Sequence, residues 1–283
     1  MPKNNLRQPS AAGKFYPASA DLLTKEINSL LKNEKTSTSE NVLALMVPHA
    51  GYKYAGKVMA SAYSKIKDRN INTVIIIGNS HHSLFDGISV YSSGGYKTPL
   101  GEVEIDSAMA NLIIEKNEKI SFNSDAHKEE HSIEVQLPFL QNTLKEFKII
   151  PILLGNDLID NCKMLSEILV AIIGDRKDIL VIASSDMSHY PAYDDAVKVD
   201  NEVLKTIQTG DEAKLEKLLL DLEIEIIPNG VSFLCGSGAV KTVMLLAKDL
   251  GANKIDILKY MNSGDTISDK GGVVGYGAVS FSF

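Results

Sequence analysis

The stretch Thr73-Val74-Ile75-Ile76-Ile77-Gly78-Asn79-Ser80-His81-His82 joins an uninterrupted apolar run to two histidines. A short run of β-branched residues, bounded by glycine and polar residues, is typical of a strand that is covered on both faces. In α/β proteins, ligands bind beyond the carboxyl ends of such strands. The stretch therefore predicts a buried strand and a site that begins where the strand ends.

Other parts of the chain repeat this pattern. Nearly continuous apolar runs predict further buried strands at Leu43–Val47, Ile149–Leu154 and Ile179–Ala183. Less uniform runs predict strands at Ile88–Tyr91, Ile255–Met261 and Val273–Phe281, and the alternation in the last of these suggests an edge strand. Helical periodicity is found near residues 20–33, 56–68, 106–117, 132–146, 158–173, 195–208, 211–220 and 237–250.

The alternation of strands and helices predicts the fold class. It favours an α/β fold with a central, mostly parallel sheet flanked by helices. The polar run Lys35–Glu40 is expected to be a loop, and no segment has the composition of a long linker. We therefore expect one domain that spans residues 1–283.

The composition limits the classes of partner. The 283 residues carry a formal net charge of −7, which argues against nucleic acid and against a polybasic membrane-surface role. No apolar run approaches the roughly 18 residues of a membrane span, and Met1–Arg7 lacks the hydrophobic stretch of a signal peptide. Two cysteines cannot form a disulfide framework. We expect a soluble, cytoplasmic protein with no membrane partner, and its oligomeric state stays open.

The six histidines fall into four short clusters, and three clusters follow an apolar run. His49 and His81 each come after a predicted buried strand, in polar surroundings that contain glycine. Histidine is the commonest metal ligand, so two of them at neighbouring strand ends indicate a metal or active site. His82 is expected to support this site by hydrogen bonding, because adjacent residues rarely both face one metal.

The third cluster contains Asp186 and His189, which follow the apolar run at Ile179–Ala183. A carboxylate beside an imidazole fixes its tautomer and raises its basicity, as in an acid–base pair. The alternative is an aspartate that caps a helix and a histidine on the surface.

The two cysteines differ in their surroundings. Cys235 precedes a predicted helix, where the helix dipole would lower the pKa of the thiol and favour a thiolate. It is equally typical of a small buried residue before a turn. Cys162 shares a helical stripe with Ile159 and Leu165, which favours core packing.

Two short motifs suggest other chemistry. The segment His127-Lys128-Glu129-Glu130-His131 matches the H-x-x-E-H signature of inverted zinc peptidases. That motif needs a helix interior, whereas Pro138 interrupts the helix soon afterwards, so a solvated helix start is the simpler interpretation. In Gly236–Thr242, Val240 stands where a phosphate-binding loop requires glycine, which excludes that loop.

Several longer motifs, in order along the chain, resemble the Memo family. They are Arg7-Gln8-Pro9 with Ala12–Pro17, Val47–Tyr52, Gly78–His82, Glu130–Pro138, Ser184–Tyr190, Ser263-Gly264-Asp265 and Val274–Ala278. The resemblance covers essentially the whole chain. It implies a layered fold like that of the class III extradiol dioxygenases, which hold non-haem iron with two histidines and a glutamate.

The resemblance also implies roles for individual residues. His49 and His81 match two metal ligands, and Cys235 falls at the third ligand position in place of a carboxylate. His189 falls at the position of an acid–base histidine, with Asp186 beside it. Supporting or pocket-lining positions are implied for His82, His127, His131 and Tyr54.

The cofactor and function follow from these implied roles. Iron(II) is the metal that the resemblance implies, while a soft thiolate ligand also suits copper or zinc. We expect metal-dependent redox or oxygenase activity on a small molecule, with radical-SAM and AMMECR-type proteins as partners. The alternative is a non-catalytic adaptor that reuses the dioxygenase-like fold and binds a peptide or protein partner in its cleft. A zinc peptidase built on His127 and His131 is a third hypothesis.

Overall fold

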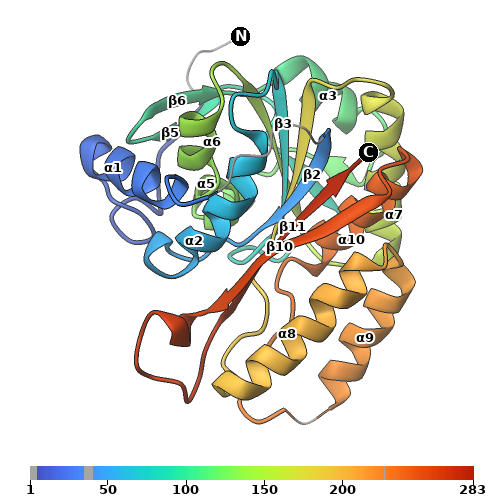
Figure 1. Cartoon of the computed structure of the whole chain (residues 1–283). Coiled ribbons are helices and arrows are strands. Elements are labelled where there is room, and N and C mark those ends of the chain that lie inside the picture. The colour runs from blue at the N-terminus through green and yellow to red at the C-terminus, as the bar shows by residue number, and fades with distance from the viewer. Residues whose placement is uncertain (1–4, 35–40, 226) are drawn as a thin grey trace.

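The computed structural model describes residues 5–34, 41–225 and 227–283, and it has a large sheet with helices on both faces (Figure 1). The expected loop Lys35–Glu40 lies outside these ranges, as do residues 1–4. Within the described ranges, none of the helices combines the length and the apolar character that crossing a membrane requires.

The large sheet has the strand order β10-β11-β2-β9-β3-β8-β4-β7. Its strands are β2 (Val42–Val47), β3 (Thr73–Asn79), β4 (Ile88–Val90), β7 (Ile120–Ser121), β8 (Lys148–Leu154), β9 (Ile179–Ser184), β10 (Lys254–Asn262) and β11 (Gly275–Ser282). The four central strands β2, β9, β3 and β8 are parallel, whereas β11 and β10 on one side and β4 on the other join the sheet antiparallel to their inner neighbours. The sheet is therefore mixed, with a parallel centre.

Helices cover both faces of this sheet (Figure 1). On one face lie α1 (Ala20–Leu31), α2 (Tyr52–Tyr63), α5 (His131–Glu134) and α6 (Leu137–Thr143). On the other face lie α7 (Ile159–Ile173), α8 (Tyr193–Gln208), α9 (Glu212–Ile224) and α10 (Ser237–Asp249). The shorter pieces are α3 (Ser107–Ile114), α4 (Ser124–Lys128) and the 3₁₀ turns at Ser64–Ile66 and Ser263–Asp265. Because both faces are covered, every residue of β2, β9 and β11 is buried.

The predicted α/β class, with a central sheet flanked by helices, is confirmed, and three details differ. β11 is not an edge strand, because it pairs with both β10 and β2 and is buried throughout. The helix expected near 132–146 is split into α5 and α6, with Pro138 in the first turn of α6, where its missing N–H costs nothing. A second, small sheet was not predicted: β1 (Leu6–Arg7), β5 (Gly95–Thr98) and β6 (Gly101–Glu104) are too short to give a periodic signal.

The parallel centre of the sheet places three loops together. Since β2, β9 and β3 are neighbours and run the same way, their carboxyl ends meet at one edge. The loops that follow them carry His49, Asp186 and His81, respectively. This edge is where ligands of α/β sheets bind.

Candidate metal centre

Three imidazole rings face one another at the carboxyl edge of the sheet. His49 follows β2, His81 follows β3, and His131 opens α5. The ring centroids are 5.0 Å apart for His49 and His81, 5.2 Å for His49 and His131, and 5.0 Å for His81 and His131. One ligand nitrogen from each ring lies within 4.8 Å of the other two. This triangle is suited to hold a metal ion.

The hydrogen bonds of His49 fix its tautomer. The Ser184 hydroxyl donates to the carbonyl of Ser132 at 2.7 Å and accepts from the Gln136 amide at 2.9 Å. Because its only proton is used, this hydroxyl must also accept at 3.1 Å from the Nδ1–H of His49. The Nε2 atom of the buried His49 ring therefore carries the lone pair, which faces the sulfur of Cys235. Burial and nearby His81 lower the pKa of His49, which keeps the ring neutral, as a ligand must be.

A carboxylate fixes His81 in the same tautomer. One oxygen of Glu130 lies 2.9 Å from Nδ1 of His81, and the other accepts the backbone N–H of His81 at 2.7 Å. These bonds outweigh the desolvation of Glu130 and hold its pKa well below the usual range, so it stays a carboxylate. An acceptor at Nδ1 leaves Nε2 of His81 free. A histidine oriented by a carboxylate is a recurrent feature of metal sites.

His131 belongs to the histidine triangle, whereas the sequence assigned it to the pocket wall. It reaches the triangle because α5 packs closely on β3: a Cβ at Gly78 would lie 2.5 Å from the Ser132 hydroxyl. Burial lowers the pKa of His131 to about 4, so this ring is also neutral. Nothing in the sequence indicates that Gly78 and the start of α5, more than 50 residues apart, are in contact. For this reason His131 was not expected among the ligands.

Cys235 adjoins the triangle from the side of α10. Its sulfur lies 3.2 Å from Nε2 of His49, and the close approach depends on Gly236, where a Cβ would lie 2.3 Å from the carbonyl of Ser184. Burial and the nearby Asp186 raise the pKa of the thiol well above its usual value. Burial therefore favours the protonated thiol over the thiolate that the helix-dipole argument suggested. A metal ion would have to displace the thiol proton.

Asp186 is buried behind the loop of His49. Its carboxylate accepts the backbone N–H of His49 at 2.8 Å and that of Ala50 at 3.2 Å. Burial raises the pKa of Asp186 to about 7. The sequence suggested that Asp186 pairs with the imidazole of His189, but these bonds show that it orders the loop that carries His49.

His189 has a buried ring nitrogen without a partner. Its backbone bridges two segments, since its N–H donates to the carbonyl of Ser232 at 2.7 Å and its carbonyl accepts from Val231 at 3.0 Å. Within the described residues, nothing forms a hydrogen bond with Nε2 of His189. Burial and His81 lower its pKa, which leaves a neutral base beside the triangle. This ring nitrogen is therefore available to accept a hydrogen bond or a proton from a bound molecule.

Asp200 on α8 holds the segment that carries His189, because it binds the preceding residue, Ser188. Its carboxylate accepts from the Ser188 N–H at 2.9 Å, the Ser188 hydroxyl at 3.0 Å and the Tyr260 hydroxyl at 2.7 Å. Burial nevertheless raises its pKa to about 6.

This raised pKa gives a pH-dependent stability. Because the pKa is higher in the folded than in the unfolded chain (about 3.9), the contribution of Asp200 is greatest below pH 4 and is lost as the pH rises through 6. A pKa difference of one corresponds to about 1.4 kcal/mol. We therefore expect the contribution of Asp200 to the free energy of unfolding to fall by about 2–3 kcal/mol between pH 4 and pH 7. Urea unfolding at pH 4 and 7 tests this, since the difference between wild type and Asp200→Asn should change by that amount. A pH-independent difference would contradict it.

The remaining predicted residues have different surroundings. His127 is fully buried, and its two ring nitrogens lie 2.9 Å from the Tyr96 hydroxyl and 3.0 Å from the Ser89 hydroxyl. Because α4 ends at Lys128 and α5 begins at His131, the H-x-x-E-H segment is not one helix, which removes the basis of the peptidase hypothesis. The ring of His82 is 6.0 Å from that of His131.

Tyr54 and Cys162 complete the comparison with the sequence. Tyr54 lies in the first turn of α2. The pKa of Tyr276 is raised mainly by burial, with smaller contributions from Asp186 and Tyr54. Cys162 is buried on α7, as expected of a core residue.

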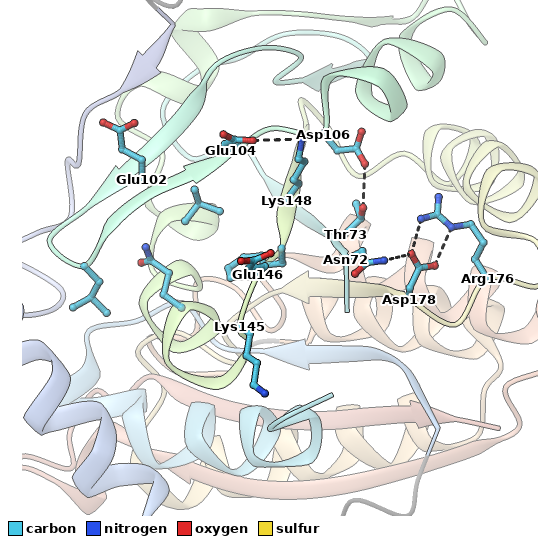
Figure 2. Close-up of a pocket in the computed structure, with 14 residues that line it drawn as sticks. Asn72, Thr73, Glu102, Glu104, Asp106, Lys145, Glu146, Lys148, Arg176 and Asp178 are labelled. Carbon is cyan, nitrogen blue, oxygen red and sulfur yellow. Dashed lines mark hydrogen bonds and ion pairs between the residues drawn. The ribbon is translucent and has the colours of Figure 1, made fainter. Parts of the chain in front are cut away.

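One cavity in the described part of the chain lies away from the histidines. It has a volume of about 850 Å³ and lies at the amino ends of β3, β8 and β9, opposite to the histidines (Figure 2). Some of its charges are paired: Lys148 pairs with Glu104 at 3.4 Å and Arg176 with Asp178 at 2.8 Å. None of the clustered histidines lines this cavity, so we place the candidate site at the opposite, carboxyl edge of the sheet.

Comparisons with known proteins agree over nearly the whole chain. Residues 7–280 match the family model described as Memo-like protein. A MEMO1 family protein of Methanobrevibacter smithii is 38% identical and one of Sulfolobus acidocaldarius is 36% identical, and each match covers 98% of this chain and 99% of the relative. The crystal structure of an uncharacterized Escherichia coli K12 protein has a TM-score of 0.53 at 13% identity, covering 85% of this chain and 99% of that one. The last likeness concerns the fold alone.

Proposed function

The chain belongs to the Memo family, and from this membership and the geometry we propose that it binds one transition metal ion at the histidine triangle. The observation that carries the proposal is the pair of imidazoles, His49 and His81, each oriented by a hydrogen bond at Nδ1 that leaves Nε2 for a metal ion. Although burial opposes it, the hydrogen bond to Glu130 raises the pKa of His81, so a metal ion would compete with a proton at that ring. The unpartnered Nε2 of His189 beside the triangle supports chemistry at this site, because it leaves a neutral base available to a substrate.

For the third donor we choose Cys235, which contacts His49 but does not belong to the group of His49, His81 and His131 whose ligand atoms lie within 4.8 Å of one another. Donors on one ion lie about 3–3.5 Å apart when the metal–nitrogen and metal–sulfur bonds are about 2.0 and 2.3 Å long. The 3.2 Å between Sγ of Cys235 and Nε2 of His49 falls in this range. His131 is the competing third donor, since its ligand nitrogen lies within 4.8 Å of those of His49 and His81.

We assign iron(II) to this site, with copper and zinc as competitors. Imidazole suits all three metals, whereas a thiolate shifts the preference toward copper and zinc or changes the potential of iron. When bound, such an ion supplies Lewis acidity and, for iron or copper, one-electron chemistry. The function is then a redox reaction on a small hydroxyl-bearing molecule.

The chain's own residues orient this chemistry. Glu130 holds His81, while Ser184 and Asp186 hold the ring and the backbone of His49. These three supporting residues are buried, whereas His81 itself is exposed, so the site is open on the side of His81. His189, neutral and unpartnered at Nε2, accepts the proton of a substrate hydroxyl at that atom.

Metal content after anaerobic purification tests the proposal. We expect about one iron per chain in the wild type and a substoichiometric amount in Cys235→Ala, because a ligand is lost. His131→Gln and His189→Ala should keep their metal. If Cys235→Ala keeps it while His131→Gln loses it, the third ligand is His131. If no variant changes the metal content, the proposed site is wrong, and the alternative of a metal-free adaptor gains support.

A further inference from the structure

A second cavity shares Cys235 with the candidate metal centre. Its volume is about 390 Å³, and it lies between α9, the start of α7 and the segment 231–237 that leads into α10. Cys235 contributes to its wall, whereas the histidine triangle does not. We call it the α9 cavity.

The rim of the α9 cavity is apolar and exposed. Leu158 is 60% exposed, Leu220 is 52% exposed and Val231 is 74% exposed, and all three line the cavity. Leu219 and Phe233 continue the apolar surface inward. Single exposed apolar residues are common, but three of them around one hollow indicate an interaction site.

The charges around the α9 cavity are mainly negative. Asp157, Glu216 and Glu223 line it, together with a single cation, Lys241. That lysine is buried and already bound, since its Nζ lies 2.6 Å from Glu216 and 2.8 Å from the carbonyl of Asp157. The cavity therefore presents excess negative charge and no free cation among its lining residues.

We propose that the α9 cavity is the docking site for a basic amphipathic helix of a partner protein. The partner's apolar side chains would enter between Leu220, Leu158 and Val231, and its lysines or arginines would face Glu223 and Asp157. A second copy of this chain fits less well, because it carries the same acidic rim and a net charge of −7. The proposal does not depend on the metal centre.

A designed peptide probes this site on the full chain. The probe is a fluorescein-labelled amphipathic helix of leucine and lysine, compared with a twin in which glutamate replaces every lysine. Fluorescence anisotropy should show saturable binding of the lysine peptide and none of the glutamate peptide. Leu220→Asp should weaken binding at least about tenfold, because it places a charge in the apolar rim. Leu112→Asp is the matched control: this leucine is 41% exposed and lies on α3, which Figure 1 places at the opposite end of the molecule from α9.

A charge reversal separates the site from general electrostatic attraction. Glu223→Lys should weaken binding of the lysine peptide and allow binding of the glutamate peptide. If Leu220→Asp, Glu223→Lys and Leu112→Asp all bind the lysine peptide as the wild type does, the attraction is only that of the net charge and the proposal is wrong. It is also overturned if neither peptide binds, or if the wild type self-associates and Leu220→Asp is monomeric, since the occupant is then a second copy.

Discussion

His49→Ala and His81→Ala are each expected to weaken iron(II) binding by at least about a hundredfold. Outer residues that only orient a ligand already contribute about 10–100-fold to metal affinity, so losing the ligand itself has a larger effect. Each substitution removes an Nε2 lone pair that the protein has fixed toward the triangle. A competition titration against a chromophoric chelator, under anaerobic conditions, measures the affinity.

His82→Ala is the matched control for this experiment. His82 neighbours His81 in the chain, but its ring is 6.0 Å from that of His131 and it is not part of the triangle. Its loss should change the affinity less than about threefold. Glu130→Gln should give an intermediate effect of about 10–100-fold, because it disturbs the orientation of His81 but removes no ligand. An equal effect of all four substitutions would contradict the assignment and indicate a general loss of structure.

Glu134→Ala is expected to lower the free energy of unfolding by about 3–5 kcal/mol. Glu134 is fully buried, and its carboxylate accepts hydrogen bonds from Arg7, from the backbone and hydroxyl of Ser10, from the Ala11 N–H and from the Tyr16 hydroxyl. Removing it leaves the guanidinium of Arg7 buried without a counter-charge, and breaking one side of a buried ion pair costs about this much. The substitution also releases the segment 7–16 from α5.

Urea unfolding of three variants measures this contribution. The double variant Arg7→Met with Glu134→Leu should be much less destabilised than Glu134→Ala, because no buried charge remains unpaired. Glu102→Ala, at an exposed carboxylate on β6, should stay within about 0.5 kcal/mol of the wild type. A loss below about 1 kcal/mol for Glu134→Ala would mean that this network does not hold the N-terminal segment in place.

The strands and two of the site residues were predictable because their signals are local. The apolar runs at Thr73–Ile77 and Leu43–Val47 form β3 and β2 almost as expected, since a strand buried on both faces needs no alternation. The positions of His49 and His81 then follow from topology, because neighbouring parallel strands end at the same edge.

Other features depend on contacts between distant residues, which a single sequence does not reveal. His131 enters the triangle only because Gly78 allows α5 to pack against β3. Cys235 is a protonated thiol because burial raises its pKa, and burial cannot be inferred from its position before a helix. Asp186 binds the loop of His49, a contact across 137 residues that its spacing from His189 concealed.

Anomalous scattering from a crystal soaked with iron(II) tests the central claim most directly. Data recorded at the iron and copper absorption edges locate the ion and identify it. The account predicts one iron peak within bonding distance of Nε2 of His49, Nε2 of His81 and Sγ of Cys235. No peak at the histidine triangle, or a peak at His127 or elsewhere in the chain, would contradict it.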